Sequence, residues 1–138
     1  MNKKEIDQFK DEMQYYAWLK YTIELLEREK ELIEYEMSGV KGISYGEKVS
    51  VSEEAKSERI LGLIDKYNDL LDKLNDHQKR LDKLNKVLDQ MTYYERNMFL
   101  LIYEERLSYQ QVANRFYISK AGLFYRMTRV LERVKYEE

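Results

Sequence analysis

The chain has 138 residues, of which 36% are charged, and its formal net charge is −2, with no Pro, no Cys and a single His. The absence of Cys excludes a disulfide framework and thiolate chemistry, and the longest apolar run, Met98 to Tyr103, is far shorter than the roughly 20 residues of a membrane span. Few Gly and many Glu, Lys, Leu and Asp residues favour an all-α fold. Because the N-terminal residues lack the apolar stretch of a signal peptide, we expect a soluble, cytoplasmic protein without a membrane partner.

Residues 3–37 are predicted to form one amphipathic helix, because apolar side chains recur three and four residues apart from Ile6 to Met37. The exposed-looking acids Glu24, Glu27, Glu31 and Glu34 are interpreted as a solvated helix face, and Tyr15, Tyr16, Trp18 and Tyr21 as core and interface packing. Three glycines then end the helix in the segment 38–52. Its alternating sequence KVSVS suits a short strand, but we expect an ordered loop. Ser50 and Glu53 have the spacing of a capping box for the next helix.

A long helix is predicted over residues 53–90, since apolar residues alternate there at spacings of four and three over more than four heptads. The predicted seam consists of Ile60, Leu63, Tyr67, Leu70, Leu74, His77, Leu81, Leu84 and Leu88. Such a long helix needs a partner: the first helix folded back as a hairpin, the same helix of a second chain, or both. We therefore interpret residues 1–90 as a helical, coiled-coil region that makes a homo-oligomer, with a dimer as the first expectation. A lone His without Cys is a poor metal site, so His77 is interpreted as a polar residue that sets the register.

Residues 91–138 are predicted to form a compact domain of three short helices with a helix-turn-helix. Thr92 with Glu95, and Ser108 with Gln111, have the spacing of capping boxes that begin two of these helices. Ser119 begins the last, a predicted recognition helix over residues 119–134. Ala113 is small where two helices of the motif would cross. Tyr117 stands where the turn commonly carries Gly, and a positive φ at this residue costs about 1 kcal/mol.

Charge is unevenly spread along the chain. Residues 1–91 carry 16 basic and 20 acidic side chains, whereas residues 106–135 carry seven basic side chains and one acid, a local net charge of +6. This asymmetry is typical of a body that carries a basic nucleic-acid-binding end. The helical spacing turns Lys120, Tyr125 and Thr128 away from the core, with arginines beside them to contact phosphates. The predicted DNA-binding residues are Ser108, Tyr109, Arg115, Ser119, Lys120, Ala121, Gly122, Phe124, Tyr125, Arg126, Thr128, Arg129 and Arg133.

The stretch LSYQQVANRFYISKAGLFYRMTRVLERV resembles region 4 of bacterial sigma factors, in which an "lsy-x-x-IA" helix precedes an "iS-x-x-x-V-x-x-R" recognition helix. Arg126 stands where that pattern carries Arg. The whole layout, with VKGISYGEKVSVS between the helices, resembles small transcriptional regulators of phages and mobile elements in Gram-positive bacteria, of the late-gene activator and autolysin-regulator types. No stretch resembles the sigma parts that melt promoters. The resemblance implies a sequence-specific regulator, an activator, in a bacterial host cell, with double-stranded DNA and RNA polymerase as partners.

Two other classes of function stay open from the sequence. A phage DNA-packaging adaptor, such as a small terminase subunit, also joins a DNA-binding motif to oligomerising helices, and a coiled-coil interaction protein would bind no DNA. An enzyme is not expected, because the chain has no Ser/His/Asp or Cys/His set, no phosphate-binding Gly loop and no metal-ligand spacing. No catalytic residue, metal or cofactor is therefore predicted.

Overall fold

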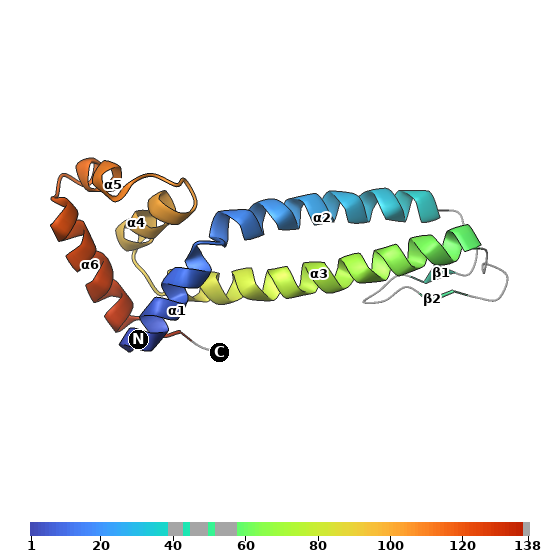
Figure 1. Ribbon diagram of the computed structural model, residues 1–138, viewed down its shortest axis with the longest axis horizontal. Helices are drawn as coiled ribbons and strands as arrows, with labels where there is room; N and C mark the ends of the chain where they lie inside the picture. The colour runs from blue at the N-terminus through green and yellow to red at the C-terminus, as the bar shows by residue number, and fades with distance from the viewer. Residues whose placement is uncertain (39–42, 45–49, 52–57, 137–138) are drawn as a thin grey trace. The chain divides into compact units, whose positions relative to one another are not determined.

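The computed structural model describes residues 1–38, 43–44, 50–51 and 58–136, and it is all-α apart from one pair of two-residue strands (Figure 1). The elements in chain order are α1 Lys3–Met13, α2 Tyr16–Met37, β1 Ile43–Ser44, β2 Ser50–Val51, α3 Glu58–Leu88, α4 Tyr93–Tyr103, α5 Tyr109–Arg115 and α6 Lys120–Arg133. The chain forms two compact units, one made of Met1–Lys20 with Arg80–Glu138 and the other of Tyr21–Lys79. Residues 1–20 and 80–90, which the sequence analysis grouped with the coiled-coil region, thus lie in one unit with residues 91–138.

The single helix predicted over residues 3–37 is wrong at Gln14 and Tyr15, where α1 ends and α2 begins. There the backbone tightens, with Gln14 N–H donating to Asp11 O at 3.3 Å and Tyr15 N–H donating to Glu12 O at 2.9 Å. The buried side chains on both sides of the break, at residues 13, 16 and 19, are three residues apart. That spacing fits the tighter turn, which has three residues per turn instead of 3.6.

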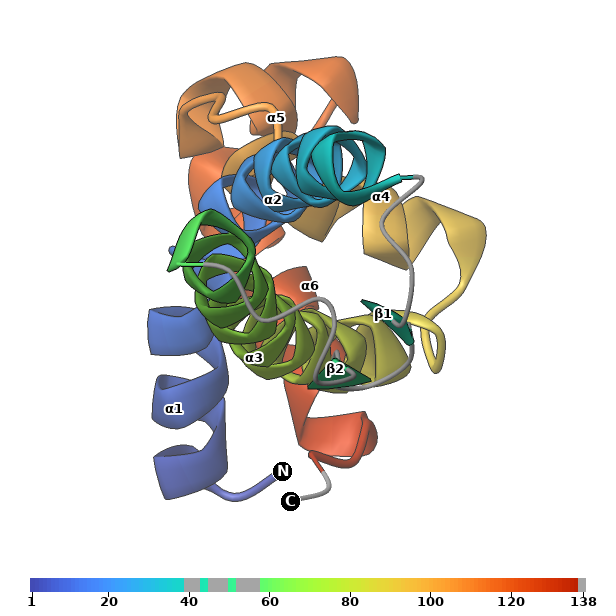
Figure 2. The same ribbon diagram turned by 90° about the vertical axis from the view of Figure 1, so that its right-hand side faces the viewer.

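In the unit 21–79, α2 and α3 run antiparallel side by side (Figures 1 and 2). Ile23, Ile33 and Met37 of α2 are buried, and the phenol of Tyr67 in α3 donates a hydrogen bond to the Glu34 carboxylate at 3.1 Å. The strands of the connecting segment pair antiparallel, Ile43 with Val51 and Ser44 with Ser50, so part of the expected loop is a short strand pair. The predicted capping box of Ser50 and Glu53 involves a residue outside the described ones.

The heptad seam of α3 is covered by the chain itself. Seven of its nine predicted residues are buried and two, Leu63 and His77, are partly buried. This is the hairpin alternative among the three that the sequence left open for the partner of the long helix. The expectation that this seam also joins protomers stays a prediction.

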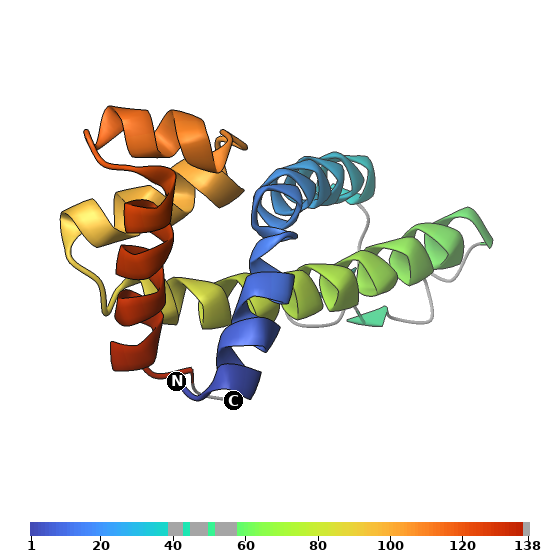
Figure 3. The same ribbon diagram turned by 60° about the vertical axis from the view of Figure 1, so that its left-hand side comes forward.

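The other unit has a core built from both ends of the chain. Phe9 of α1 is fully buried, with its ring edge-on to Phe99 of α4 at 6.3 Å and to Tyr136 at 5.7 Å. The Met1 nitrogen donates to three carbonyls at the end of α6, at 2.9 to 3.1 Å, where a cation is favoured by the helix dipole (Figure 3). Arg80 of α3 makes an ion pair with Glu12 at 2.7 Å. These contacts hold α1 and the end of α3 to the three C-terminal helices.

Candidate nucleic-acid interface

The helices α4, α5 and α6 begin at the capping residues that the sequence predicts. The Thr92 and Ser108 side chains accept hydrogen bonds from the backbone N–H groups three residues on. The side chains of those residues, Glu95 and Gln111, accept in turn from the Thr92 and Ser108 backbone N–H groups. Both predicted capping boxes are therefore confirmed. The Ser119 hydroxyl accepts a hydrogen bond from Gly122 N–H at 3.0 Å. A Cβ at Gly122 would lie 3.1 Å from that hydroxyl oxygen, which gives this glycine a role in the cap. Each cap satisfies a backbone N–H at the helix start that would otherwise lack a partner.

The connection between α5 and α6 holds Tyr117 at a positive φ, the conformation considered for it from the sequence. Ala113 is fully buried at the end of α5, and its carbonyl accepts from Ile118 N–H at 3.0 Å, which closes the turn against the helix. Tyr117, with a φ of 56°, lies in the left-handed region, and the residue is 95% exposed. The turn therefore stores backbone strain at a side chain that contributes little packing.

Replacing Tyr117 with Gly is expected to raise the free energy of unfolding by about 0.5–1 kcal/mol. The left-handed conformation costs a non-glycine residue roughly 1–2 kcal/mol, and Gly avoids this cost. Gly also has more conformational freedom in the unfolded chain, which lowers the net stabilisation. Urea unfolding of both proteins measures the difference. Tyr117→Ala is the matched control, because it removes the same ring and keeps the strain. Equal stabilities of the Gly and Ala variants would show that the strain is absent.

The outward face of α6 carries polar, cationic and aromatic side chains. Lys120, Ala121, Tyr125 and Arg129 are exposed, and the Arg129 guanidinium lies 5.8 Å from the Tyr125 ring centroid. Opposite them, the buried residues of α6 are Leu123, Met127, Val130 and Leu131. A helix with this division of faces can bury one side in its own domain and present the other to a groove of DNA.

Phe124 is exposed, as the helical spacing predicts, and its ring also contacts α5. Its ring stacks on that of Tyr109 in α5, with centroids 4.4 Å apart and planes at 21°. Burial, and then the neighbouring Tyr109, raise the pKa of the Tyr103 phenol beneath this pair. Phe124 and Tyr109 thus join α5 to α6.

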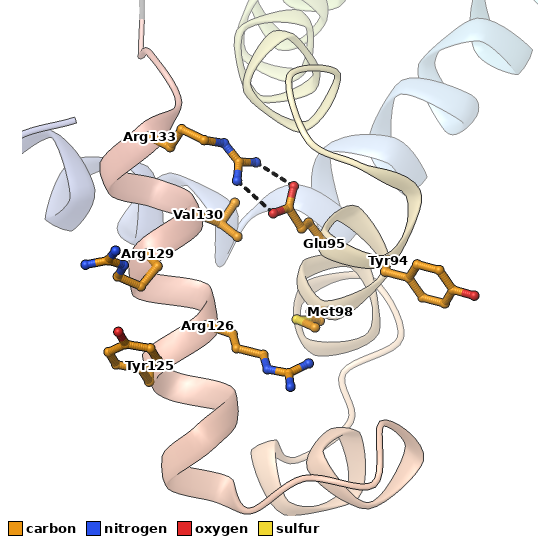
Figure 4. A pocket seen from close by; sticks show the side chains of 8 residues that line it. All are labelled: Tyr94, Glu95, Met98, Tyr125, Arg126, Arg129, Val130 and Arg133. Atoms are coloured by element: carbon orange, nitrogen blue, oxygen red, sulfur yellow. Dashed lines mark hydrogen bonds and ion pairs between the residues drawn. The ribbon is translucent and has the colours of Figure 1, made fainter.

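A hollow of about 440 Å³ lies between α4 and α6 and is lined by three arginines (Figure 4). Figure 4 shows Arg126 and Arg133 extending from α6 toward α4, while Tyr125 and Arg129 extend to the other side of the helix. Arg133 donates two hydrogen bonds to the Glu95 carboxylate, at 2.9 and 2.5 Å. Glu95 also completes the α4 capping box, so one carboxylate holds both the start of α4 and the end of α6. Arg126, which faces the same hollow, pairs with no carboxylate among the described residues.

No protein-family model, curated protein or solved structure matches this chain. None of the described helices combines the length and the apolar character needed to cross a membrane. Among the described residues, no three His, Cys, Asp or Glu side chains come together in a way that would hold a metal ion.

The predicted DNA-binding residues all lie in α5, in α6 or at the capping residues before these helices, and most are exposed. Those that are exposed are Ser108, Arg115, Ser119, Lys120, Ala121, Phe124, Tyr125, Arg126, Arg129 and Arg133, while Tyr109, Gly122 and Thr128 are partly buried. Arg133 is bound by Glu95, which the sequence analysis used only as a capping residue. The sequence offered no signal for this pair, since its members are 38 residues apart.

The Glu95–Arg133 pair makes a testable contribution to stability at neutral pH. Hydrogen bonds from Arg133, and then from the Thr92 backbone, lower the pKa of Glu95 from 4.5 to about 2. Because the folded-state pKa is the lower one, this stabilisation is present above about pH 4.5 and is lost as the pH falls toward 2. We expect Glu95→Gln, which keeps a capping side chain, to unfold more easily than the parent at pH 7 and equally at pH 2.

Urea unfolding of both proteins from pH 7 to pH 2 measures this convergence. Arg133→Gln removes the other half of the pair and should give the same pH-dependent difference. A constant difference between Glu95→Gln and the parent over the whole range would contradict the assignment.

Proposed function

We propose that the protein binds double-stranded DNA in a sequence-specific manner and regulates transcription, with α5 and α6 acting as a sigma-region-4-like helix-turn-helix. The observation that carries the proposal is the outward face of α6, which exposes Lys120, Tyr125 and Arg129. The resemblance of residues 107–134 to sigma region 4 supports the same role. The resemblance to phage and mobile-element regulators supports an activator.

The proposed roles differ along α6. Near its beginning, Lys120 and Ala121 lie next to the first N–H groups of the helix, whose dipole favours a phosphate. Tyr125 lies one turn further, where side chains of a recognition helix contact base edges. Arg129 and Arg126 flank this helix on its two sides (Figure 4) and suit the two phosphate strands that border a groove. Arg133 has a smaller part in binding, because breaking its pair with Glu95 opposes any new contact.

Selection from a random pool of duplex DNA with the full chain tests this proposal. We expect one short motif to be enriched over successive rounds, and the affinity for it to fall steeply as salt rises, because phosphate contacts release bound counterions. The matched variant Tyr125→Ala should change which bases are enriched. A pool that stays random after selection with the parent protein would contradict sequence-specific binding.

A further inference from the structure

The helix α2 carries a second apolar stripe that its packing against α3 does not use. Tyr21, Leu25, Leu32 and Tyr35 have exposed fractions of 62%, 37%, 64% and 80%. With Arg28 they follow one another at spacings of four, three, four and three residues, which is a heptad repeat. Single exposed apolar residues are common on protein surfaces, but a row at this spacing marks a surface that a helix can cover.

This stripe lies on nearly the opposite side of α2 from the buried one. The buried side chains are Ile23, Ile33 and Met37, with Leu26 partly buried between them. At about 100° per residue, the centres of the two stripes are roughly 150° apart around the helix. One stripe is therefore buried within the unit 21–79, and the other is exposed on the described residues. We call the residues Tyr21, Leu25, Arg28, Leu32 and Tyr35 the outer seam.

Charge decides which molecule fits the outer seam. The charged residues that flank it are Glu24, Glu29, Glu31 and Glu36, and all four are exposed. In a parallel pair of two copies, Glu24 would lie opposite Glu29, and an antiparallel pair would also bring glutamate against glutamate. A parallel pair would also place the two Arg28 side chains near each other, and an antiparallel pair would place them near each other or among apolar residues. Like charges at these positions oppose association, so a second copy of the chain is a poor partner.

A hollow at the edge of the outer seam favours a basic partner. It measures about 290 Å³ and is lined by Glu29, Leu32, Ile33 and Glu36 of α2 and by Lys66 of α3. Its walls combine apolar side chains with two carboxylates and one ammonium. A Lys or Arg side chain fits such a place, because its aliphatic stem packs on apolar surface while its charge stays near the carboxylates.

We propose that the outer seam of α2 binds an amphipathic helix of another protein, one with an apolar heptad seam and basic flanking residues. The partner helix places its apolar residues between Tyr21 and Tyr35 and its Lys or Arg side chains beside the four glutamates. An acidic side chain of the partner lies opposite Arg28. This inference does not rest on DNA binding, since none of its residues belongs to the interface on α6.

Two synthetic three-heptad helices test the proposal by fluorescence anisotropy with the full chain. Both have Leu at the seam positions and one central Glu, but one has Lys at every flanking position and the other has Glu. We expect the Lys-flanked helix to bind at least roughly tenfold more tightly, from several flanking ion pairs acting together. Leu25→Gln with Leu32→Gln should weaken its binding by at least about tenfold, with unchanged circular dichroism because both residues are exposed.

Two further variants keep the test independent of folding. Leu61→Gln removes an exposed apolar residue on α3 outside the outer seam and should leave binding unchanged. Glu29→Lys with Glu36→Lys should reverse the preference, so that the Glu-flanked helix binds more tightly. Equal binding of both helices, binding of neither, or full binding by the double Gln variant would overturn the proposal. A doubled mass in sedimentation that the double Gln variant loses would overturn it in favour of a second copy.

Discussion

The combined variant Lys120→Ala and Arg129→Ala is expected to lose about a hundredfold or more in affinity for its selected DNA. Hydrogen bonds to charged groups contribute about 1.5–3 kcal/mol each, and every 1.4 kcal/mol is about tenfold in affinity. The loss should extend to unrelated sequences, because both side chains are assigned to phosphates. The slope of affinity against salt should also become shallower by about one unit of charge for each lost contact.

Electrophoretic mobility shift or anisotropy titrations at several salt concentrations measure both effects. Lys3→Ala with Lys4→Ala is a matched control, because it removes two exposed cations of α1 from the same unit. Arg133→Ala should have a smaller effect than Arg129→Ala, since Arg133 is already bound by Glu95. If the control and the α6 variant lost affinity equally, binding would follow general charge rather than the outward face of α6.

Replacing Phe9 with Ala is expected to lower the free energy of unfolding by about 3–5 kcal/mol, the usual cost of removing a fully buried aromatic ring. Phe9 has no exposed surface, and its ring contacts those of Phe99 and Tyr136. The substitution leaves a cavity between α1 and the C-terminal helices, which these rigid neighbours fill only in part. Thermal and urea unfolding measure the loss.

Tyr35→Ala is the control for that experiment, because it removes a ring that is 80% exposed and should change stability by less than about 0.5 kcal/mol. Residues 91–138 produced alone lack Phe9, so we also expect this fragment to unfold at lower urea concentration than the full chain. A Phe9→Ala protein as stable as the parent would contradict the packing of α1 into this unit.

Local patterns in the sequence predict the features that depend on neighbouring residues. Ser108 and Ser119 cap helices because their side chains reach backbone N–H groups three residues away, and this spacing can be read directly from the sequence. The small Ala113 and the strained Tyr117 follow in the same way from the register of a two-helix turn. The spacing of α3 also predicts its buried face, although it leaves the covering partner open.

Local sequence patterns do not predict contacts between segments that are distant in the chain. The pair of Glu95 with Arg133 joins residues 38 positions apart, and Phe9 packs on Phe99 from the other end of the chain. Periodicity gives the face that a helix buries but not the surface that it meets. For this reason periodicity groups α1 with the long helices, although it lies in one unit with residues 91–138, and it gives no sign that the exposed Phe124 ring stacks on Tyr109.

Nuclear magnetic resonance of the isotope-labelled full chain, titrated with its selected duplex, would locate the DNA-binding surface residue by residue. We expect the amide signals of residues 119–129 to shift most, with smaller changes in α5, and those of Leu25 and Leu32 on α2 to stay in place. Binding through the outward face of α6 would be contradicted by signals that shift along α2 instead. It would also be contradicted by the absence of shifts at duplex concentrations that saturate binding in the anisotropy titration.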